Sequence, residues 1–165
     1  MSRQTQHIEG GGGQQWLALA LWIAVVAAVA LAGSSVTLPK IPTWYASLAK
    51  PSFTPPNAIF GPVWTILYLM MAVAVWRIGT GDPARKRAVG LFAVQLALNA
   101  IWSPVFFGLE APKLGLAVIV ALLVSLAATV VAFWRIDRPA GLLLAPYHLW
   151  VCYASALNAA IVALN

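Results

Sequence analysis

The side chains that could bind or transform a ligand in this chain are aromatic rings and amides rather than acids. The 165 residues include 8 Trp, 6 Phe and 4 Tyr. The four acidic residues all lie outside the long apolar stretches, at Glu9, Asp82, Glu110 and Asp137. Proton-coupled transport usually needs a carboxylate inside the membrane, and acid–base catalysis needs a positioned titratable group. The sequence therefore favours a binding site of rings and amides, and it predicts no metal site.

Residues 88–108 carry two opposite stripes at helical spacing, since a helix turns by about 100° per residue. The polar and aromatic stripe consists of Gln95, Asn99, Trp102 and Phe106. The small-residue stripe consists of Gly90, Ala93, Ala97 and Ala100. One face can offer amides and rings to a pocket, and the other lets a helix approach closely. That neighbouring helix could belong to the same protomer or to the second copy in a dimer.

Two further stretches present aromatic stripes at the same spacing. The stripe within 59–76 consists of Phe60, Trp64, Tyr68 and Met71. The stripe within 140–164 consists of Tyr147, Trp150, Ala154 and Asn158. One aromatic stripe in a membrane helix usually serves packing. Three stripes together with an aromatic loop predict an apolar cavity for a flat ligand.

His148 is the only titratable group well inside an apolar stretch. A histidine in this position could ligate haem iron. However, His148 lies about 160° around the helix from Trp150, so it would face away from the predicted cavity. We expect a neutral histidine that is hydrogen-bonded to a neighbouring helix.

The elements that position these side chains follow from composition and from five uncharged stretches. The chain is 62% hydrophobic and 8% charged, whereas soluble domains are about 25% charged. Each stretch is close to the roughly 20 residues that span a bilayer as a helix. The predicted helices cover residues 16–38, 59–76, 88–108, 114–134 and 140–164. The predicted fold is an all-α integral membrane protein, a bundle of five transmembrane helices over 16–165.

The polar, glycine-rich residues 1–15 are predicted to form a disordered tail. Ala30-Leu31-Ala32 resembles a signal-peptidase site, but the apolar run continues past it, so the first stretch is expected to remain as a helix. The net charge of +6 comes from residues between apolar stretches. This arrangement is typical of anchoring beside a lipid bilayer and argues against nucleic acid as a partner.

Residues 39–58 form the predicted lid loop. This loop carries five prolines together with Trp44, Tyr45 and Phe53, and residues 42–49 could make two helical turns. An apolar, proline-stiffened loop is costly to expose to water, so we expect it to fold back over the bundle. The alternative is a segment that lies on the membrane surface without a ligand.

The distribution of Lys and Arg predicts the orientation. The tail and the loops after the second and fourth helices hold seven of these residues, and the opposite side holds three, Lys40, Lys50 and Lys113. The positive-inside rule then places the N-terminus in the cytoplasm and the C-terminus outside, if the membrane is an inner membrane.

Several long motifs resemble one known family. The run WYASLAKPSFTPP at 44–56 fits the pattern WYxxLxKPxxxPP, and GPVWTILY at 61–68 fits the entry of the second helix. The third and fifth helices match through QLALN at 95–99, Trp102, Pro104, Phe106, Phe107, Pro146-Tyr147, Trp150 and Leu157-Asn158. Through these motifs, residues 34–160 resemble the translocator protein (TspO, tryptophan-rich sensory protein, peripheral-type benzodiazepine receptor) family.

The resemblance implies a five-helix bundle, often a homodimer, with a lidded pocket that binds porphyrins such as protoporphyrin IX and haem as ligands rather than resident cofactors. It implies a role in porphyrin sensing, transfer or stress regulation. The matching pocket positions are Tyr45, Trp64, Tyr68, Gln95, Asn99, Trp102, Phe106, Trp150 and Asn158. The aromatic stripe of 140–164 adds Tyr147 and Ala154 to the candidate ligand-binding residues.

The resemblance leaves the activity open. Trp64 and Trp150 match two tryptophans tied to light-dependent porphyrin breakdown in some bacterial relatives, so a porphyrin-degrading catalyst is the alternative function.

Animal relatives also bind cholesterol and benzodiazepine-type drugs. Their cholesterol motif needs a basic residue shortly after a tyrosine, and no Lys or Arg follows Tyr153, so sterol recognition is not carried over. His148 stands where relatives usually have an apolar residue.

Overall fold

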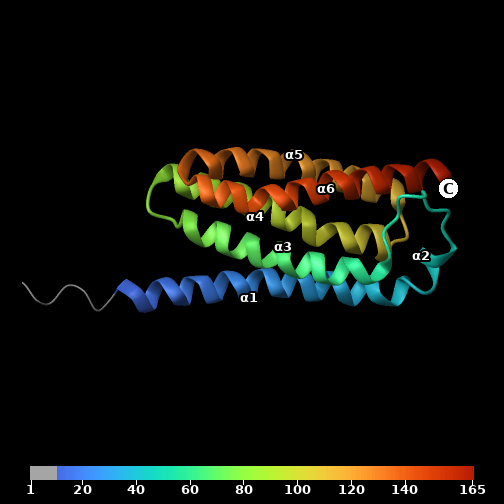
Figure 1. Ribbon diagram of the computed structural model, residues 1–165, viewed down its shortest axis with the longest axis horizontal. Helices are drawn as coiled ribbons and strands as arrows, with labels where there is room; N and C mark the ends of the chain where they lie inside the picture. The colour runs from blue at the N-terminus through green and yellow to red at the C-terminus, as the bar shows by residue number, and fades with distance from the viewer. Residues whose placement is uncertain (1–10) are drawn as a thin grey trace, which may run out of the picture.

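The computed structural model describes residues 11–165, which fold into a bundle of long helices lying side by side (Figure 1). The long helices are α1 (Gly11–Thr37), α3 (Asn57–Ile78), α4 (Pro83–Ser103), α5 (Pro112–Ile136) and α6 (Arg138–Leu164). Short turns at η1 (Leu38–Lys40), α2 (Trp44–Ser47) and η2 (Pro104–Gly108) lie at one end. Among the described residues, five helical segments are long and apolar enough to cross a membrane. The predicted all-α bundle of five membrane helices is confirmed.

The helices run beyond the apolar stretches that predicted them. Helix α1 begins at Gly11, so the disorder predicted for 11–15 is wrong, while residues 1–10 lie outside the described part of the chain. Two contacts hold this extension. The Trp76 Nε1 donates to the carbonyl of Gln15 at 2.9 Å, and the rings of Trp16 and Trp76 stack with centroids 6.0 Å apart. A bilayer limits the apolar length of a helix but not its hydrogen bonding, which continues into the interface.

The lid loop contains one helical turn, Trp44–Ser47, instead of the two turns expected over 42–49. Leu48 is already extended, with ψ 141°. The Lys50 Nζ donates to the carbonyls of Tyr45 and Leu48 at 2.7 and 3.0 Å. An ammonium therefore satisfies carbonyls that a second turn would have paired with backbone N–H groups.

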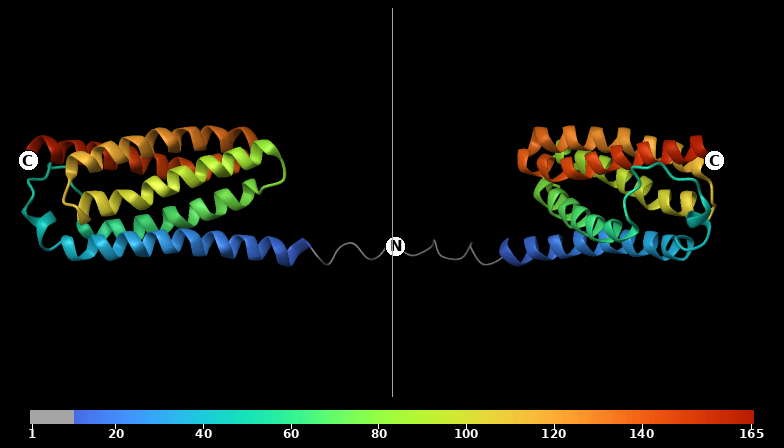
Figure 2. Two further views of the ribbon diagram at one scale, coloured as in Figure 1. Left: turned by 180° about the vertical axis from the view of Figure 1, so that it is seen from behind. Right: turned by 45° about the vertical axis from the view of Figure 1, so that its right-hand side comes forward.

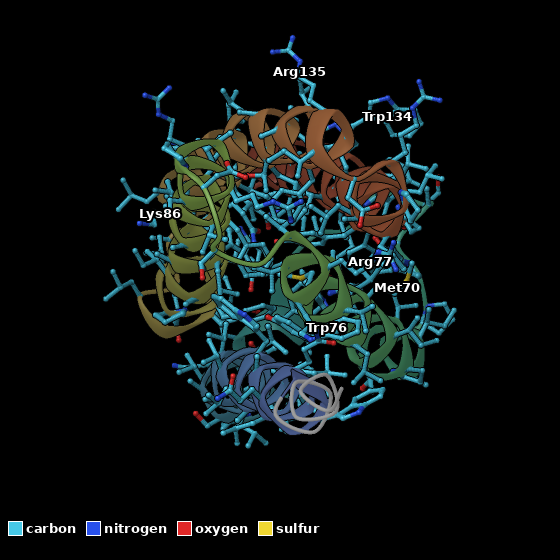
Figure 3. The ribbon with its side chains drawn as sticks, turned by 90° about the vertical axis from the view of Figure 1, so that its left-hand side faces the viewer. Met70, Trp76, Arg77, Lys86, Trp134 and Arg135 are labelled. Carbon is cyan, nitrogen blue, oxygen red and sulfur yellow. The ribbon has the colours of Figure 1, made fainter. Side chains whose placement is uncertain are left out.

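Helix α1 lies along one side of the bundle, against α3 and α4, while α5 packs against α4 and α6 (Figures 1 and 2). The two connections at one end, 79–82 and the residue Asp137, are short. We call this the basic end, because Arg77, Lys86 and Arg135 gather there (Figure 3). The other end, which carries 38–56 and the connection 109–111, is called the lid end.

Local chemistry explains where the helices turn at the basic end. Asp82 caps α4 by accepting hydrogen bonds from the backbone N–H groups of Ala84 and Arg85 at 2.9 and 3.0 Å. The Arg85 backbone N–H, followed by that of Ala84 and the Arg85 charge, lowers the pKa of Asp82. Gly79 ends α3 at φ 62°, a left-handed conformation that glycine adopts without steric cost.

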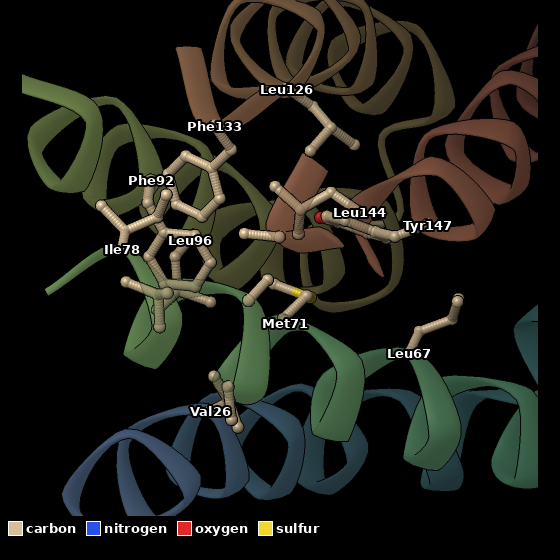
Figure 4. Close-up of a cluster of buried hydrophobic side chains, with 14 of the residues drawn as sticks. Val26, Leu67, Met71, Ile78, Phe92, Leu96, Leu126, Phe133, Leu144 and Tyr147 are labelled. Carbon is tan, nitrogen blue, oxygen red and sulfur yellow. The ribbon is translucent and has the colours of Figure 1, made fainter. Parts of the chain in front are cut away.

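The half of the bundle nearest the basic end is closely packed (Figure 4). Its fully buried side chains come from four helices: Met71, Val75, Ile78, Phe92, Leu126, Phe133 and Leu144. Phe92 stacks on Phe133 with ring centroids 6.0 Å apart and meets Trp22 edge-on at 5.6 Å. This core positions the helices whose other ends form the candidate site.

Candidate functional site

A cavity of about 520 Å³ lies in the lid-end half of the bundle. It is lined by side chains from α1, α3, α4, η2, α5 and α6 and by Leu38, Ile41 and Tyr45 of the lid. Pockets of this size and apolar character are typical of small-molecule sites. The stripes predicted on three separate helices thus meet in one place.

Aromatic rings form much of the cavity wall. On α3, Trp64 lies against Tyr68 with centroids 5.4 Å apart. Trp102 of α4 stacks on Phe106 of η2 at 5.1 Å, and Trp150 of α6 meets Phe60 edge-on at 5.8 Å. Rings held by other rings keep a fixed orientation, so they offer a flat ligand a preformed surface.

The π-helical turn η2 explains how Phe106 reaches the cavity. Pro104 has no N–H to donate, and the Leu109 N–H bonds back to the Pro104 carbonyl at 2.9 Å, a five-residue step. This wider turn ends α4 with both Phe106 and Phe107 buried.

A hydrogen-bonded chain crosses three helices beside the cavity. The Tyr68 hydroxyl donates to Asn99 Oδ1 at 2.6 Å, and Asn99 Nδ2 donates to the Tyr147 hydroxyl at 2.9 Å. A buried amide in a membrane protein costs free energy unless it is paired. This chain therefore fixes the rotamer of Asn99 and links α3, α4 and α6 at the inner end of the cavity.

Two tryptophan N–H groups of the cavity wall differ in their pairing. Trp102 Nε1 donates to Asn158 Oδ1 at 3.4 Å, and Asn158 Nδ2 donates to the Pro112 carbonyl at 2.9 Å. The Nε1 of Trp150 is buried and has no partner among the described residues. Trp150 lines the cavity, while its Nε1 is enclosed by the protein.

The turn α2 separates the two adjacent aromatic residues of the lid. Tyr45 is buried and lines the cavity, with its ring 5.6 Å from that of Phe107. Burial, and secondarily the charge of Tyr153, raises the pKa of the Tyr45 phenol. Trp44 lines a separate hollow with Leu48 and Pro112 on the other side of the turn.

Nine of the eleven candidate ligand-binding residues line the cavity: Tyr45, Trp64, Tyr68, Asn99, Trp102, Phe106, Trp150, Ala154 and Asn158. Tyr147 does not, because it is fully buried behind Asn99. Gln95 does not either; it is fully buried, and neither of its amide atoms has a partner among the described residues. Helical spacing gave the face of each residue correctly but not its depth along the bundle.

Sequence reasoning missed the contribution of α1. This helix supplies Ile23, Val26, Ala27, Ala30, Leu31, Gly33, Ser34 and Thr37 to the cavity wall. It carries no aromatic or amide stripe at this level, so nothing distinguished its lining residues from lipid-facing ones. The small residues Ala27, Ala30, Gly33 and Ser34 were the available signal.

His148 does not line the cavity, as its helical position predicted. Its Nδ1 is buried without a partner among the described residues, so the expected hydrogen bond to a neighbouring helix is not found.

The small-residue stripe of α4 points outward. Gly90, Ala93 and Ala97 are exposed, and a Cβ added at Gly90 would meet nothing within 4 Å. These three residues therefore do not serve close packing inside the protomer.

Comparison with known proteins gives a consistent result. The model of the TspO/MBR family matches residues 22–164. The tryptophan-rich protein TspO of Chlorobaculum tepidum is 48% identical over 156 residues, which cover 92% of this chain and 98% of that protein. The protein of the same name from Archaeoglobus fulgidus is 43% identical, covering 90% and 97%. The human translocator protein is 42% identical over 121 residues, covering 70% of each chain.

Proposed function

The chain belongs to the TspO/MBR family, and on that premise we propose that it binds planar tetrapyrroles such as protoporphyrin IX and haem in the cavity at the lid end. The bound tetrapyrrole would be sensed or transferred, as part of porphyrin handling or a stress response. The names of the relatives agree with a tryptophan-rich membrane protein and with translocation.

One observation carries the proposal: a cavity of about 520 Å³ is walled by aromatic rings from three separate helices. The rings of Trp64, Trp102 and Trp150 can face a large flat apolar ligand. Rings that served packing alone would fill this space with side chains.

A titration of the purified protein with protoporphyrin IX tests this proposal. The porphyrin absorbance should shift on binding and saturate at a fixed ratio of ligand to protein. Tyr45→Ala should weaken binding by about 5- to 150-fold, because a buried ring contributes on the order of 1–3 kcal/mol. The matched variant Trp44→Ala changes the ring on the other side of α2 and should weaken binding less. Absence of saturable binding, or a larger loss at Trp44, would contradict the assignment.

The alternative function is photo-oxidative degradation of the porphyrin. It is supported by the position of Trp64 and Trp150, two indoles that line the same cavity from α3 and α6. The double variant Trp64→Phe/Trp150→Phe keeps apolar rings but removes both indoles. If the chain is such a catalyst, this variant should bind porphyrin yet bleach it more slowly under light. Equal bleaching by the variant and the native chain would exclude these residues from the chemistry.

The proposed orientation places the basic end in the cytoplasm. The connection after α3 and the start of α4 hold Arg77, Arg85, Lys86 and Arg87 at that end. Single cysteines at the exposed positions Thr80 and Ser52, in a Cys152→Ser background, report the two sides. An impermeant thiol reagent added to intact cells should label position 52 and spare position 80. The reverse pattern would invert the orientation.

We also propose that two copies associate through the outward stripe of Gly90, Ala93 and Ala97. Small residues let helices approach closely in lipid, and this stripe is exposed on α4. Ala93→Phe should shift the purified protein from dimer to monomer in light scattering, whereas Ala128→Phe, on the exposed face of α5, should not. A dimer unaffected by Ala93→Phe would place the interface elsewhere.

A further inference from the structure

Part of the cavity wall is also part of the outer surface of the bundle. On α1, Ile23, Ala27 and Leu31 line the cavity and are exposed. On α3, Gly61, Thr65 and Leu69 also line the cavity and are exposed. Each set repeats every four residues, so each forms one stripe along its helix.

The two stripes face each other. The stacked pair Trp16 and Trp76 fixes the register of the antiparallel helices α1 and α3 at the basic end. Counting from that pair at equal rise along both helices brings Ala27 level with Thr65, and Leu31 level with Gly61. The cavity therefore reaches the surface along the seam between α1 and α3.

Small side chains occupy the middle of this seam. A Cβ added at Gly61 would meet nothing within 4 Å, which shows open space there. Ala27 lies across the seam from Thr65, whose hydroxyl donates to the Gly61 carbonyl at 2.9 Å. The only hydroxyl at this level is thus bonded to its own helix, and the seam presents an apolar edge that suits lipid.

The lid end is closed by contrast. Asn165 exchanges two hydrogen bonds with the backbone of Ala49, both at 3.0 Å. The Tyr153 hydroxyl donates to the Phe53 carbonyl at 2.7 Å. Passage from water would require these bonds to break, whereas the described hydrogen bond between α1 and α3, from Trp76 Nε1 to the Gln15 carbonyl, lies at the basic end, away from the cavity-lining stripes. Helix α1 also buries the least of the five spans, with 6% of its most apolar stretch buried against 28% in each of the other four.

We propose that the seam between α1 and α3 is a lateral portal through which the tetrapyrrole passes between the bilayer and the cavity. This proposal rests on the proposed function. A flat apolar ligand concentrates in the hydrocarbon of the membrane, and entry through the seam spares it a transfer into water. The flat ligand then enters with its edge leading and reaches the ring-lined wall, while the lid stays in place.

Stopped-flow kinetics with variants that fill the seam test the portal. Protoporphyrin IX is supplied in phosphatidylcholine vesicles and mixed with vesicles that contain the protein, and quenching of tryptophan fluorescence reports binding. Thr65→Leu adds bulk at an exposed position of the seam on α3, and Ala27→Leu does so from the other side of the seam. Gly13→Leu and Ala128→Leu are the matched controls at exposed positions away from the cavity.

Both positions also line the cavity, so the release rate is the deciding measurement: Thr65→Leu and Ala27→Leu should each lower kon and koff by about tenfold. The two controls should match the native chain. Unchanged kon in both seam variants overturns the portal, and so does an unchanged or faster koff, which would make these positions only part of the ligand contact. A faster kon in Asn165→Ala, with both seam variants unaffected, would place entry under the lid.

Failure of the portal and failure of the proposed function give different results. If the native chain does not bind the porphyrin at equilibrium, the proposed function is wrong. If the native chain binds it and the seam variants bind at the native rate, only the portal is wrong.

Discussion

The basic-end half and the lid-end half of the same helices are built on opposite plans. In the basic-end half, apolar side chains such as Met71, Phe92 and Leu144 fill the space between helices and are fully buried. In the lid-end half, the helices enclose about 520 Å³ of cavity. The hollow half also holds the polar chain from Tyr68 through Asn99 to Tyr147. Packing thus stabilises one half, and the other half keeps space for a ligand.

This contrast shows how a small membrane bundle can keep a preformed cavity. Empty space forfeits dispersion contacts, so a hollow region needs other restraints. Here they are ring-on-ring contacts, interhelical amide bonds and a proline-stiffened lid. The same restraints decide which side chains would face the proposed ligand, so stability and the proposed binding depend on the same residues at the lid end but not at the basic end.

The two halves should differ most in their response to large-to-small substitutions. Phe92→Ala opens a void in the packed half and should lower the free energy of unfolding by about 3–5 kcal/mol. Phe60→Ala only enlarges an existing cavity and should cost clearly less, while it weakens porphyrin binding. Thermal unfolding of both variants in one detergent, without ligand, measures the difference. Equal losses of stability would mean that the hollow half is packed as tightly as the other.

A pair of glycines on the two ends gives a second, smaller contrast. A Cβ at Gly141 would lie 2.9 Å from backbone atoms of Trp134, which cannot move aside. Gly141→Ala should therefore cost about 1–3 kcal/mol through overpacking. A Cβ at Gly115 would lie 2.9 Å from the ring of Phe106, which borders the cavity and can shift into it.

Gly115→Ala should for that reason cost less stability than Gly141→Ala but displace Phe106 and weaken porphyrin binding. Unfolding and porphyrin titration of the same two samples separate the effects. A Gly115→Ala variant that binds porphyrin like the native chain would show that the Phe106 ring is not held against the ligand.

The hydrogen-bonded chain offers a third test. Tyr147→Phe removes the acceptor for Asn99 Nδ2 in a fully buried site and should cost about 0.5–1.5 kcal/mol. Tyr68→Phe removes a donor at the cavity wall, where a ligand or a solvent molecule can take its place, so it should cost less. Unfolding of both variants with and without porphyrin measures this. A greater cost for Tyr68→Phe would show that Asn99 depends mainly on α3.

The sequence predicted the helices and the ring-bearing faces because both follow from periodicity. Trp64, Trp102 and Trp150 recur at helical spacing, and the structure brings them to one cavity. The depth of each residue along the bundle was not predictable, because a stripe continues along the whole helix whereas the cavity occupies only the lid-end half. Gln95 shares the stripe of Asn99 but lies inside the packed bundle, one turn beyond the cavity wall.

The role of α1 was hidden for a related reason. Lipid and the cavity are both apolar environments, so side chains such as those of Ala27 and Leu31 suit either one. Only the position of a neighbouring helix distinguishes the two environments. The sequence signal was stronger for His148, because a histidine stands out inside an apolar stretch. Its Nδ1 nevertheless has no hydrogen-bond partner among the described residues.

The smallest effects are expected for the ion pairs that close the two ends. Lys40 pairs with Glu110 at 2.6 Å at the lid end, and Arg77 pairs with Asp137 at 2.9 Å at the basic end. Both pairs are partly exposed, so Glu110→Gln and Asp137→Asn should each lower the free energy of unfolding by only about 0.2–1 kcal/mol. The substitutions keep side-chain size, and Gln at 110 keeps the left-handed backbone at φ 52°. Salt should reduce either loss, because it screens the native pair.

The two variants should differ in where the protein opens. Glu110 ties the start of the lid to the connection before α5, so Glu110→Gln should speed amide hydrogen exchange across 39–55 by a few-fold. Asp137 joins helices that the packed core already fixes, so Asp137→Asn should leave exchange at the basic end near that of the native chain. Hydrogen exchange read by mass spectrometry, on samples of matched unfolding temperature, measures both. Equal protection of the lid in all three proteins would mean that the contacts of Asn165 and Tyr153 hold it without the ion pair.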